Sequence, residues 1–261
     1  MSNTVRPVGD LLREWRQRRG LSQLDLALDA EISARHLSFL ETGRSRPSRD
    51  MVLNLAERLD VPLRERNLLL HAAGFAPVFP ERPLHDPALQ AARHAIDQVL
   101  AGHEPFPALA VDRHWTLIAA NKMTERLMSG VAAKLLEPPV NVLRVSLHPE
   151  GLAPHTVNLA EWRAHLLSRL RHQIDVTSDP ALIRLLRELR DYPAPAEMHP
   201  EPDSAAVIVP FRMMSEGREL SFFGTTTVFG TPVDITLSEL ALEAFYPADA
   251  ATTEALQQMA R

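Results

Sequence analysis

Histidine is the residue type in this 261-residue sequence that most suggests metal chemistry, because eleven histidines are present. His165 and His172 lie seven residues apart, two turns along one helix face, which is too far for ordinary shared ligation. His148 and His155 have a single carboxylate between them, Glu150, and no His-Glu-x-x-His motif occurs. The spacing therefore predicts no metal site.

Other catalytic signatures are missing from the sequence as well. There is no Gly-x-Gly-x-x-Gly or Walker-type loop for phosphates and no Gly-x-Ser-x-Gly nucleophile elbow. With no cysteine, the chain has no thiolate ligand, thiol nucleophile or disulfide framework. The N-terminus lacks a secretory apolar run, and no stretch approaches the roughly 18 apolar residues that span a bilayer. These patterns favour a cytoplasmic protein that is not an enzyme, needs no cofactor and does not use a membrane.

The arginines are distributed unevenly along the chain. Residues 1–76 contain 12 Arg and no Lys against ten acidic residues, a net charge of +2. The rest contains 16 basic and 23 acidic residues, a net charge of −7, so that the whole chain carries −5. A basic N-terminal part has the right sign for a polyanionic partner, but the excess is small and matters only if the arginines share one face.

The elements that would position these arginines are short helices that follow one another through residues 8–76. Apolar residues recur there at helical spacing, and Ser22 and Ser33 are N-cap candidates. Gly20, Gly43 and Gly74 mark helix ends. A proline cluster, PVFPERPLHDP, then predicts a linker.

The remaining sequence mixes helical and strand patterns. ALAVD and WTLIAA flank Arg113–His114 and predict a β-hairpin. We expect helices at 87–100, 121–129, 158–173 and 181–190, and a final helix capped by Asp249. We expect strands at 206–213, 219–229, 233–236 and 240–245. The fold class is α+β with two domains: residues 1–76, a proline-rich linker and connecting helix at 77–104, and an α+β domain with an antiparallel sheet at 105–261.

The N-terminal pattern resembles a known family. The run GLSQLDLALDAEISARHLSFLETGRSRPSRDMVLNLAERLDV is similar to the five-helix, lambda-repressor-like helix-turn-helix of Xre-type transcription regulators. Its specific features are Leu-Ser-Gln at the start of the second helix, Ala27 at a close helix contact, and Glu-x-Gly-x-x-x-Pro-Ser after the third helix. The resemblance implies sequence-specific binding of double-stranded DNA.

The third helix is then the recognition helix that enters the major groove. Arg35 can donate two hydrogen bonds to guanine, and Phe39 either contacts a thymine methyl or packs on neighbouring helices. Gln23 matches a family position that contacts phosphate and sometimes a base. The full set of expected DNA contacts is Gln23, Ser33, Ala34, Arg35, His36, Ser38, Phe39, Arg44, Arg46 and Arg49.

The same resemblance pairs Arg16 with Glu41 in a partly buried salt bridge between the first and third helices. It also implies a homodimer on a two-fold site, because one short helix reads too few bases. The sequence does not place the dimer interface.

The C-terminal part resembles the MmyB-like regulators. The segments that carry this likeness are PALAVDRHWTLIAAN, PPVNVLRVSLHPEGLAP, NLAEWRAHLLSRLRHQ and FFGTTTVFGTPVDITLSELALEAFYPAD. In that family a helix-turn-helix precedes a PAS-like domain that accommodates fatty-acid-like ligands. The resemblance implies a regulator that senses a small apolar or amphipathic molecule, with a bound fatty acid as effector.

Candidate pocket residues follow from the strand alternation and the helix face. They are Trp162, Val209, Phe211, Met213 and Phe222, with Arg163, His165, Arg212 and His114 as candidates to meet a ligand carboxylate. The same residues also suit an ordinary filled core. Three hypotheses stay open: a hollow apolar interior for a ligand-binding domain, a filled interior for a dimerisation or interaction module, and a polar cleft for an enzyme.

Overall fold

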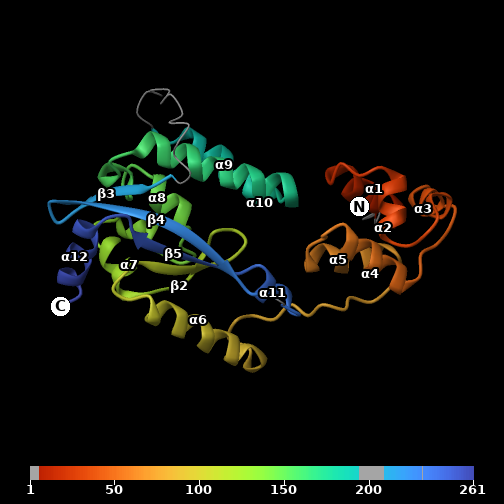
Figure 1. The fold of residues 1–261 in the computed structure, drawn as a ribbon, viewed down its shortest axis with the longest axis horizontal. Coiled ribbons are helices and arrows are strands. Elements are labelled where there is room, and N and C mark those ends of the chain that lie inside the picture. Colours follow the sequence, from red (N-terminus) through yellow and green to blue (C-terminus); the bar gives the residue numbers. More distant parts are fainter. Residues whose placement is uncertain (1–5, 194–208, 231) are drawn as a thin grey trace. The chain divides into compact units, whose positions relative to one another are not determined.

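The computed structural model describes residues 6–193, 209–230 and 232–261. The chain divides into two compact units, whose elements are labelled in Figure 1. Unit 1 comprises Met1–Pro83 and Thr231–Ser238, and unit 2 comprises Leu84–Gly230 and Glu239–Arg261. Unit 1 is therefore built from two parts of the sequence. The second part, Thr231–Ser238, is a short excursion, a segment that lies in sequence between the two parts of unit 2.

Five helices make up most of unit 1, as the periodicity predicted: α1 (Val8–Arg18), α2 (Gln23–Asp29), α3 (Ala34–Glu41), α4 (Arg49–Arg58) and α5 (Leu63–Ala72). Ser22 caps α2 in a capping box with Asp25, and Ser33 caps α3 through the amide of His36. These caps satisfy amide groups that have no partner inside a helix. The helices enclose a core in which Leu12, Leu26, Leu37, Leu55 and Leu70 are fully buried.

The linker between α5 and unit 2 is held against α5. The Asn67 side chain donates to the carbonyl oxygen of Phe79 (2.7 Å) and accepts from the amides of Val78 and Phe79. Arg64 pairs with Glu81, with Nη1 2.8 Å from Oε2. The proline-rich segment is thus an ordered part of unit 1 up to this point.

Unit 2 contains a five-stranded antiparallel sheet with the order β2-β1-β5-β4-β3. Its strands are β1 (Ala108–Val111), β2 (Leu117–Ala120), β3 (Phe211–Ser215), β4 (Arg218–Val228) and β5 (Ala241–Pro247). The predicted hairpin corresponds to β1 and β2. The central strand β5 pairs with both β1 and β4, and Glu243 of β5 stands opposite Thr226 of β4.

Helices flank this sheet, and Figure 1 shows α8, α9 and α10 on one side of it. The long helix α9 buries Trp162, Leu166, Leu167 and Leu170 along one face. The helical elements of unit 2 are η1 (Pro87–Leu89), α6 (Gln90–Gly102), α7 (Lys122–Leu127), η2 (Ala133–Leu135), α8 (Val142–Leu147), η3 (Ala153–His155), α9 (Leu159–Thr177), α10 (Pro180–Asp191) and α12 (Ala250–Met259).

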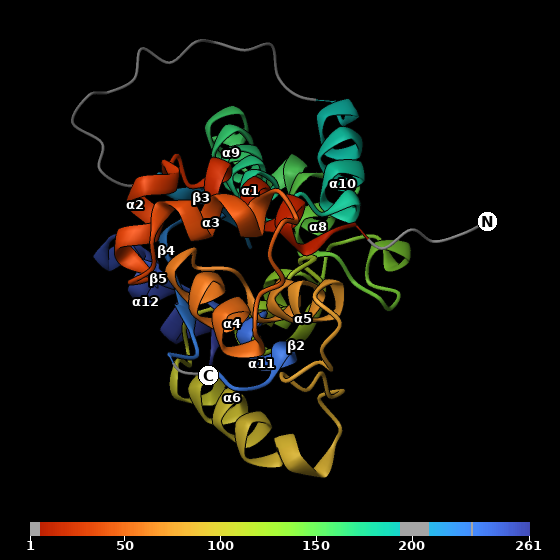
Figure 2. The same ribbon diagram turned by 90° about the vertical axis from the view of Figure 1, so that its right-hand side faces the viewer.

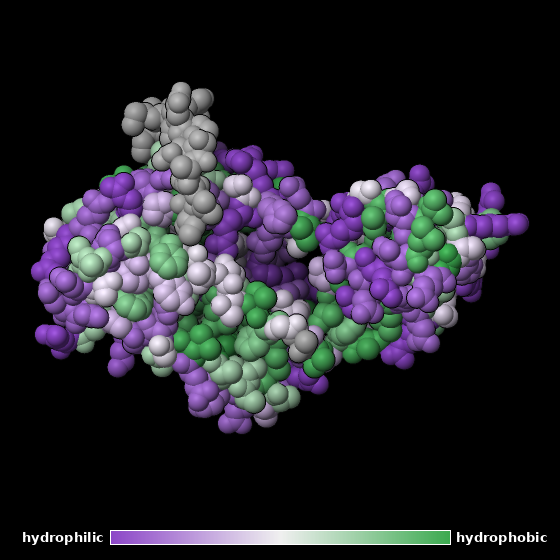
Figure 3. All heavy atoms as spheres, in the orientation of Figure 1, coloured by the Kyte–Doolittle hydropathy of each residue, from purple (hydrophilic) through white to green (hydrophobic). Residues whose placement is uncertain are grey.

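The surface of the units is largely hydrophilic on the face displayed in Figure 3, although hydrophobic side chains gather over α6, where Val99 is 52% exposed. No helix in the described ranges is long and apolar enough to cross a bilayer.

One predicted element is wrong. The β-branched run 233–236 was expected to be a strand, but it leads into the short helix α11 (Ile235–Ser238). The reason is local, because Oδ1 of Asp234 accepts a hydrogen bond from the amide of Thr236 (2.9 Å) and starts a helical turn. A strand was expected at 206–213, and β3 begins within this range, at Phe211. Residues 206–208 of the expected strand lie outside the described residues.

Candidate functional site

Helix α3, the expected recognition helix, presents a row of polar and basic side chains at the surface of unit 1. Arg35 is exposed, whereas Ala34, His36 and Ser38 are half-buried beside it. Ser33 is exposed and serves as the N-cap, so its side-chain oxygen already accepts a hydrogen bond within the protein. Arg44, Arg46 and Arg49 are exposed in and after the turn that follows α3. The arginines therefore share one region, the condition under which a small charge excess matters.

Phe39 is half-buried and lies between two of these arginines. The guanidinium carbons of Arg35 and Arg44 are 5.4 Å and 5.9 Å from the centre of its ring. Such cation–π contacts at exposed sites are worth about 0.5–1 kcal/mol each. The ring thereby restricts the positions of both guanidinium groups at the surface.

A buried ion pair connects α1 to α3. Nε and Nη2 of Arg16 donate to the two carboxylate oxygens of Glu41 at 2.6 Å and 3.0 Å, and Nη1 donates to the carbonyl of Leu21 (2.7 Å). The Glu41 side chain is 1% exposed. The hydrogen bond with Glu41 raises the pKa of the Arg16 guanidinium. The predicted Arg16–Glu41 pair is therefore present, and it ties two helices to the loop before α2.

Glu41 has a third partner, which the sequence did not indicate. Nε2 of Gln23, at the start of α2, donates to Oε2 of Glu41 across 2.7 Å. Gln23 is half-buried, so one part of its amide is held by the buried carboxylate while the rest is accessible.

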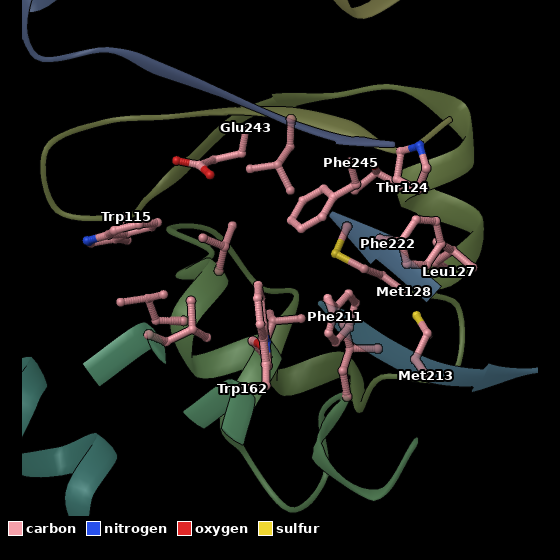
Figure 4. Close-up of a pocket in the computed structure, with 18 of the residues that line it drawn as sticks. Trp115, Thr124, Leu127, Met128, Trp162, Phe211, Met213, Phe222, Glu243 and Phe245 are labelled. Carbon is pink, nitrogen blue, oxygen red and sulfur yellow. The ribbon is translucent and has the colours of Figure 1, made fainter. Parts of the chain in front are cut away.

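Unit 2 encloses a cavity between its sheet and its helices, with a volume of about 100 Å³. Figure 4 shows its lining side chains converging from both sides. The sheet contributes Leu109, Phe211, Met213, Phe222 and Phe245, and the helices contribute Leu127, Val142, Leu143, Val145, Trp162 and Leu166. The interior is therefore hollow and mainly apolar.

Aromatic rings form the middle of this lining. The ring of Phe211 lies 4.8 Å from that of Trp162 and 6.1 Å from those of Phe222 and Phe245, measured between centroids. Trp162 is fixed by a hydrogen bond from Nε1 to Oγ of Ser146 (3.0 Å). Rigid, interlocked rings keep such a space open where flexible side chains would fill it.

Two charged residues, Arg169 and Glu243, also border the cavity. Nη1 and Nη2 of Arg169 donate to the Glu243 carboxylate at 3.1 Å and 2.8 Å, and Nη2 also contacts Oγ1 of Thr226 (3.0 Å). The guanidinium carbon lies 4.9 Å from the ring centre of Trp115. Glu243 is 7% exposed and Arg169 is 32% exposed, so the pair closes one end of an otherwise apolar space.

The predicted pocket residues divide into two groups. Trp162, Phe211, Met213 and Phe222 line the cavity. Val209 is half-buried and packs on the surrounding core.

The four cationic candidates do not line the cavity and have other partners. Arg163 donates to the carbonyl of Arg190 (2.7 Å) near the end of α10, and Arg212 pairs with Glu219 (2.6 Å). His165 stacks on Trp162, and burial lowers its pKa, while His114 bonds Asp179 (2.9 Å). The cationic side chain that does border the cavity is Arg169.

The sequence carried signals for the residues that were missed. Arg169 follows Trp162 by seven positions and Leu166 by three, so it lies on the same face of α9. Glu243 alternates with Phe245 along β5, which places both on the cavity side of the sheet. A single charged residue on the apolar face of α9, and another on the apolar face of β5, indicated a charged part of the cavity lining. Among the described residues, no three histidine or acidic side chains gather as metal ligands.

Comparisons with known proteins agree with both units. The family model for the MmyB-like transcription regulator ligand binding domain matches residues 92–259, and a helix-turn-helix model matches residues 12–66. The clp gene regulator ClgR from Corynebacterium glutamicum is a similar solved structure, 28% identical over 38% of this chain and 90% of that chain, with a TM-score of 0.23. No curated protein matches the chain. Because the ligand-binding-domain model covers more than half of the sequence, the protein belongs to the MmyB-like transcription regulators and is a DNA-binding regulator of the helix-turn-helix class.

Proposed function

We propose that this regulator senses a small apolar or fatty-acid-like molecule that binds in the cavity of unit 2. The observation that carries the proposal is the hollow interior, lined by aromatic and aliphatic side chains from both the sheet and the helices. A PAS-like domain that binds a ligand needs such a space, whereas a domain that serves only as an interaction module has no use for it.

The size of the cavity supports a ligand of modest length. One water molecule needs about 10–15 Å³ of cavity volume measured in this way, so about 100 Å³ accommodates roughly seven to ten non-hydrogen atoms. That corresponds to a medium-length acyl chain. Arg169 and Glu243 are the charged residues of the lining, so their end of the cavity is where a polar head group would lie.

On the DNA side, we propose that Arg35 contacts base edges and that Arg44, Arg46 and Arg49 contact phosphates. Their exposure and clustering around α3 support these roles. Gln23, Ser33, Ala34, His36, Ser38 and Phe39 complete the proposed surface. We also propose that the protein acts as a homodimer, since a single α3 reads too few base pairs for an operator.

Native mass spectrometry of the purified full chain, followed by DNA-binding assays with saturated carboxylic acids, tests the sensing function. We expect a bound molecule, and a change in DNA affinity when a medium-chain acid is added. A protein that carries no small molecule, binds none of the acids and still forms a dimer would instead support the alternative, a dimerisation or interaction module without ligand.

A further inference from the structure

The excursion Thr231–Ser238 connects β4 to β5, yet it belongs to unit 1. Within that unit α11 lies near α5. The amide of Ile235 donates to the carbonyl of Pro80 (2.8 Å), and Oγ1 of Thr236 donates to the carbonyl of Arg82 (2.6 Å). Asp234 is 1% exposed and accepts from Nη1 of Arg82 (3.1 Å). A loop of the ligand-binding sheet is thus built into the helix-turn-helix unit.

The two strands that lead into this loop also border the cavity. Phe222 of β4 and Glu243 of β5 both line it, and Glu243 lies only five residues after the end of α11. Thr226 joins the two strands at this level, because its Oγ1 is 3.1 Å from Oε1 of Glu243 and 3.0 Å from Nη2 of Arg169. The Arg169–Glu243 pair therefore attaches the β4–β5 hairpin to α9 at a point five residues from the end of α11.

A ligand carboxylate would bring a second negative charge to Arg169. His165 does not supply a second cation near neutral pH, because burial lowers its pKa. The ligand carboxylate and the Glu243 carboxylate then compete for the Arg169 guanidinium. The carboxylate that is displaced loses its ion pair and the hydrogen bonds that go with it. Since Glu243 is almost fully buried, loss of its ion pair leaves a buried charge, which is strongly unfavourable unless the strand moves.

We propose that the Arg169–Glu243 pair is a latch that a ligand carboxylate opens by replacing Glu243 on Arg169. Release of Glu243 loosens the β4–β5 hairpin and, through it, the contacts of α11 with Pro80 and Arg82 in the helix-turn-helix unit. The proposal rests on the proposed ligand-sensing function and adds to it the exchange of carboxylates on Arg169 and the route by which occupancy reaches the helix-turn-helix unit.

The test compares octanoate with 1-octanol, which share a chain that fits the cavity but differ in charge, on the full-length protein. Calorimetry gives their affinities, and amide hydrogen exchange follows residues 232–238. In the wild type we expect octanoate and octanol to bind about equally, because the ligand carboxylate takes over hydrogen bonds that Glu243 gives up. We expect octanoate, but not octanol, to raise exchange at Ile235.

Two variants separate the latch from the cavity. Glu243→Gln removes the competing charge, so it is expected to raise exchange at Ile235 without ligand. It is also expected to bind octanoate about tenfold more tightly than octanol, because the ligand carboxylate then gains charge-assisted hydrogen bonds with Arg169. The double variant Arg169→Gln/Glu243→Gln leaves no unpaired charge, which favours folding, and is expected to bind octanol normally without preferring octanoate. Glu188→Gln is the matched control, because it removes a carboxylate that pairs with Arg144 elsewhere in unit 2.

The outcomes are distinct. If Glu243→Gln binds octanoate no more tightly than octanol, or if exchange at Ile235 is the same in wild type, Glu243→Gln and the control, the latch is wrong while the ligand-binding function stands. If neither probe binds, the proposed function fails together with the head-group assignment, and the exchange of Glu243→Gln alone then decides whether the pair holds α11.

Discussion

Gln23 and Glu41 are joined by a hydrogen bond of 2.7 Å, from the amide nitrogen of one to a carboxylate oxygen of the other. Glu41 is buried and paired with Arg16, whereas Gln23 lies on the expected DNA-facing side. One carboxylate therefore stabilises the helix packing and orients a side chain that we expect to contact phosphate.

Glu41→Ala should lower the free energy of unfolding of the protein by about 3–5 kcal/mol, because it leaves the Arg16 guanidinium buried without its counter-ion. Urea unfolding followed by circular dichroism checks this. Glu57→Ala is the control, since Glu57 is an exposed acid on α4 and its loss should change stability little. Equal curves for the two variants would show that the ion pair is not a source of stability.

Gln23→Ala should weaken DNA binding by about two- to tenfold, the value of one hydrogen bond to phosphate, while costing little stability. The loss should be similar on specific and random DNA, because phosphate contacts carry no sequence information. Fluorescence anisotropy on both DNAs measures it. A variant that unfolds as readily as Glu41→Ala would instead assign Gln23 a purely structural role.

Arg35→Ala should weaken binding to a selected operator by about 1–3 kcal/mol and affect random DNA much less. The operator for this assay can be selected from a randomised DNA library by the unmodified protein. Arg46→Ala is the control: as a phosphate contact it should reduce affinity for both DNAs alike and lower the salt dependence by about one charge. Equal losses on both DNAs for Arg35→Ala would make Arg35 a phosphate contact.

The affinity of unit 2 for straight-chain carboxylates should rise about fourfold per methylene, from about 0.8 kcal/mol for each buried group. The rise should level off near roughly seven to ten non-hydrogen atoms, where the cavity is full. Calorimetry with straight-chain acids of about four to about sixteen carbons tests it. A steady gain up to the longest acid would mean that the cavity widens to admit the chain.

Gly9→Ala should destabilise unit 1 by about 1–3 kcal/mol, because α1 approaches α3 at this glycine. A Cβ atom there would lie 2.8 Å from the carbonyl oxygen of Glu41 and closer still to that of Leu40. Gly102→Ala is the matched control, as a Cβ at Gly102 meets no atom within 4 Å. Thermal unfolding that ranks the two variants equally would contradict the close approach.

The helices of unit 1 were predictable because their signals are local. Ser22 and Ser33 cap the helices that follow them, and the apolar period places Leu37 and Leu40 inward. The charged end of the cavity was not predicted, because Arg169 and Glu243 come from elements 74 residues apart that only the folded sheet brings together. The short helix α11 was missed for a related reason: Asp234 decides its start, whereas the β-branched residues around it suggest a strand.

The construction of unit 1 from two sequence segments affects how such regulators can be recombined. Ile235 is 2% exposed and Asp234 is 1% exposed in the intact chain. A fragment that ends at Pro83 would lack Asp234 and Ile235, and its Arg82 would have lost the carboxylate partner Asp234. A chimaera that exchanges only residues 1–83 would pair a new DNA-binding part with the old loop, so a working transplant has to carry both segments.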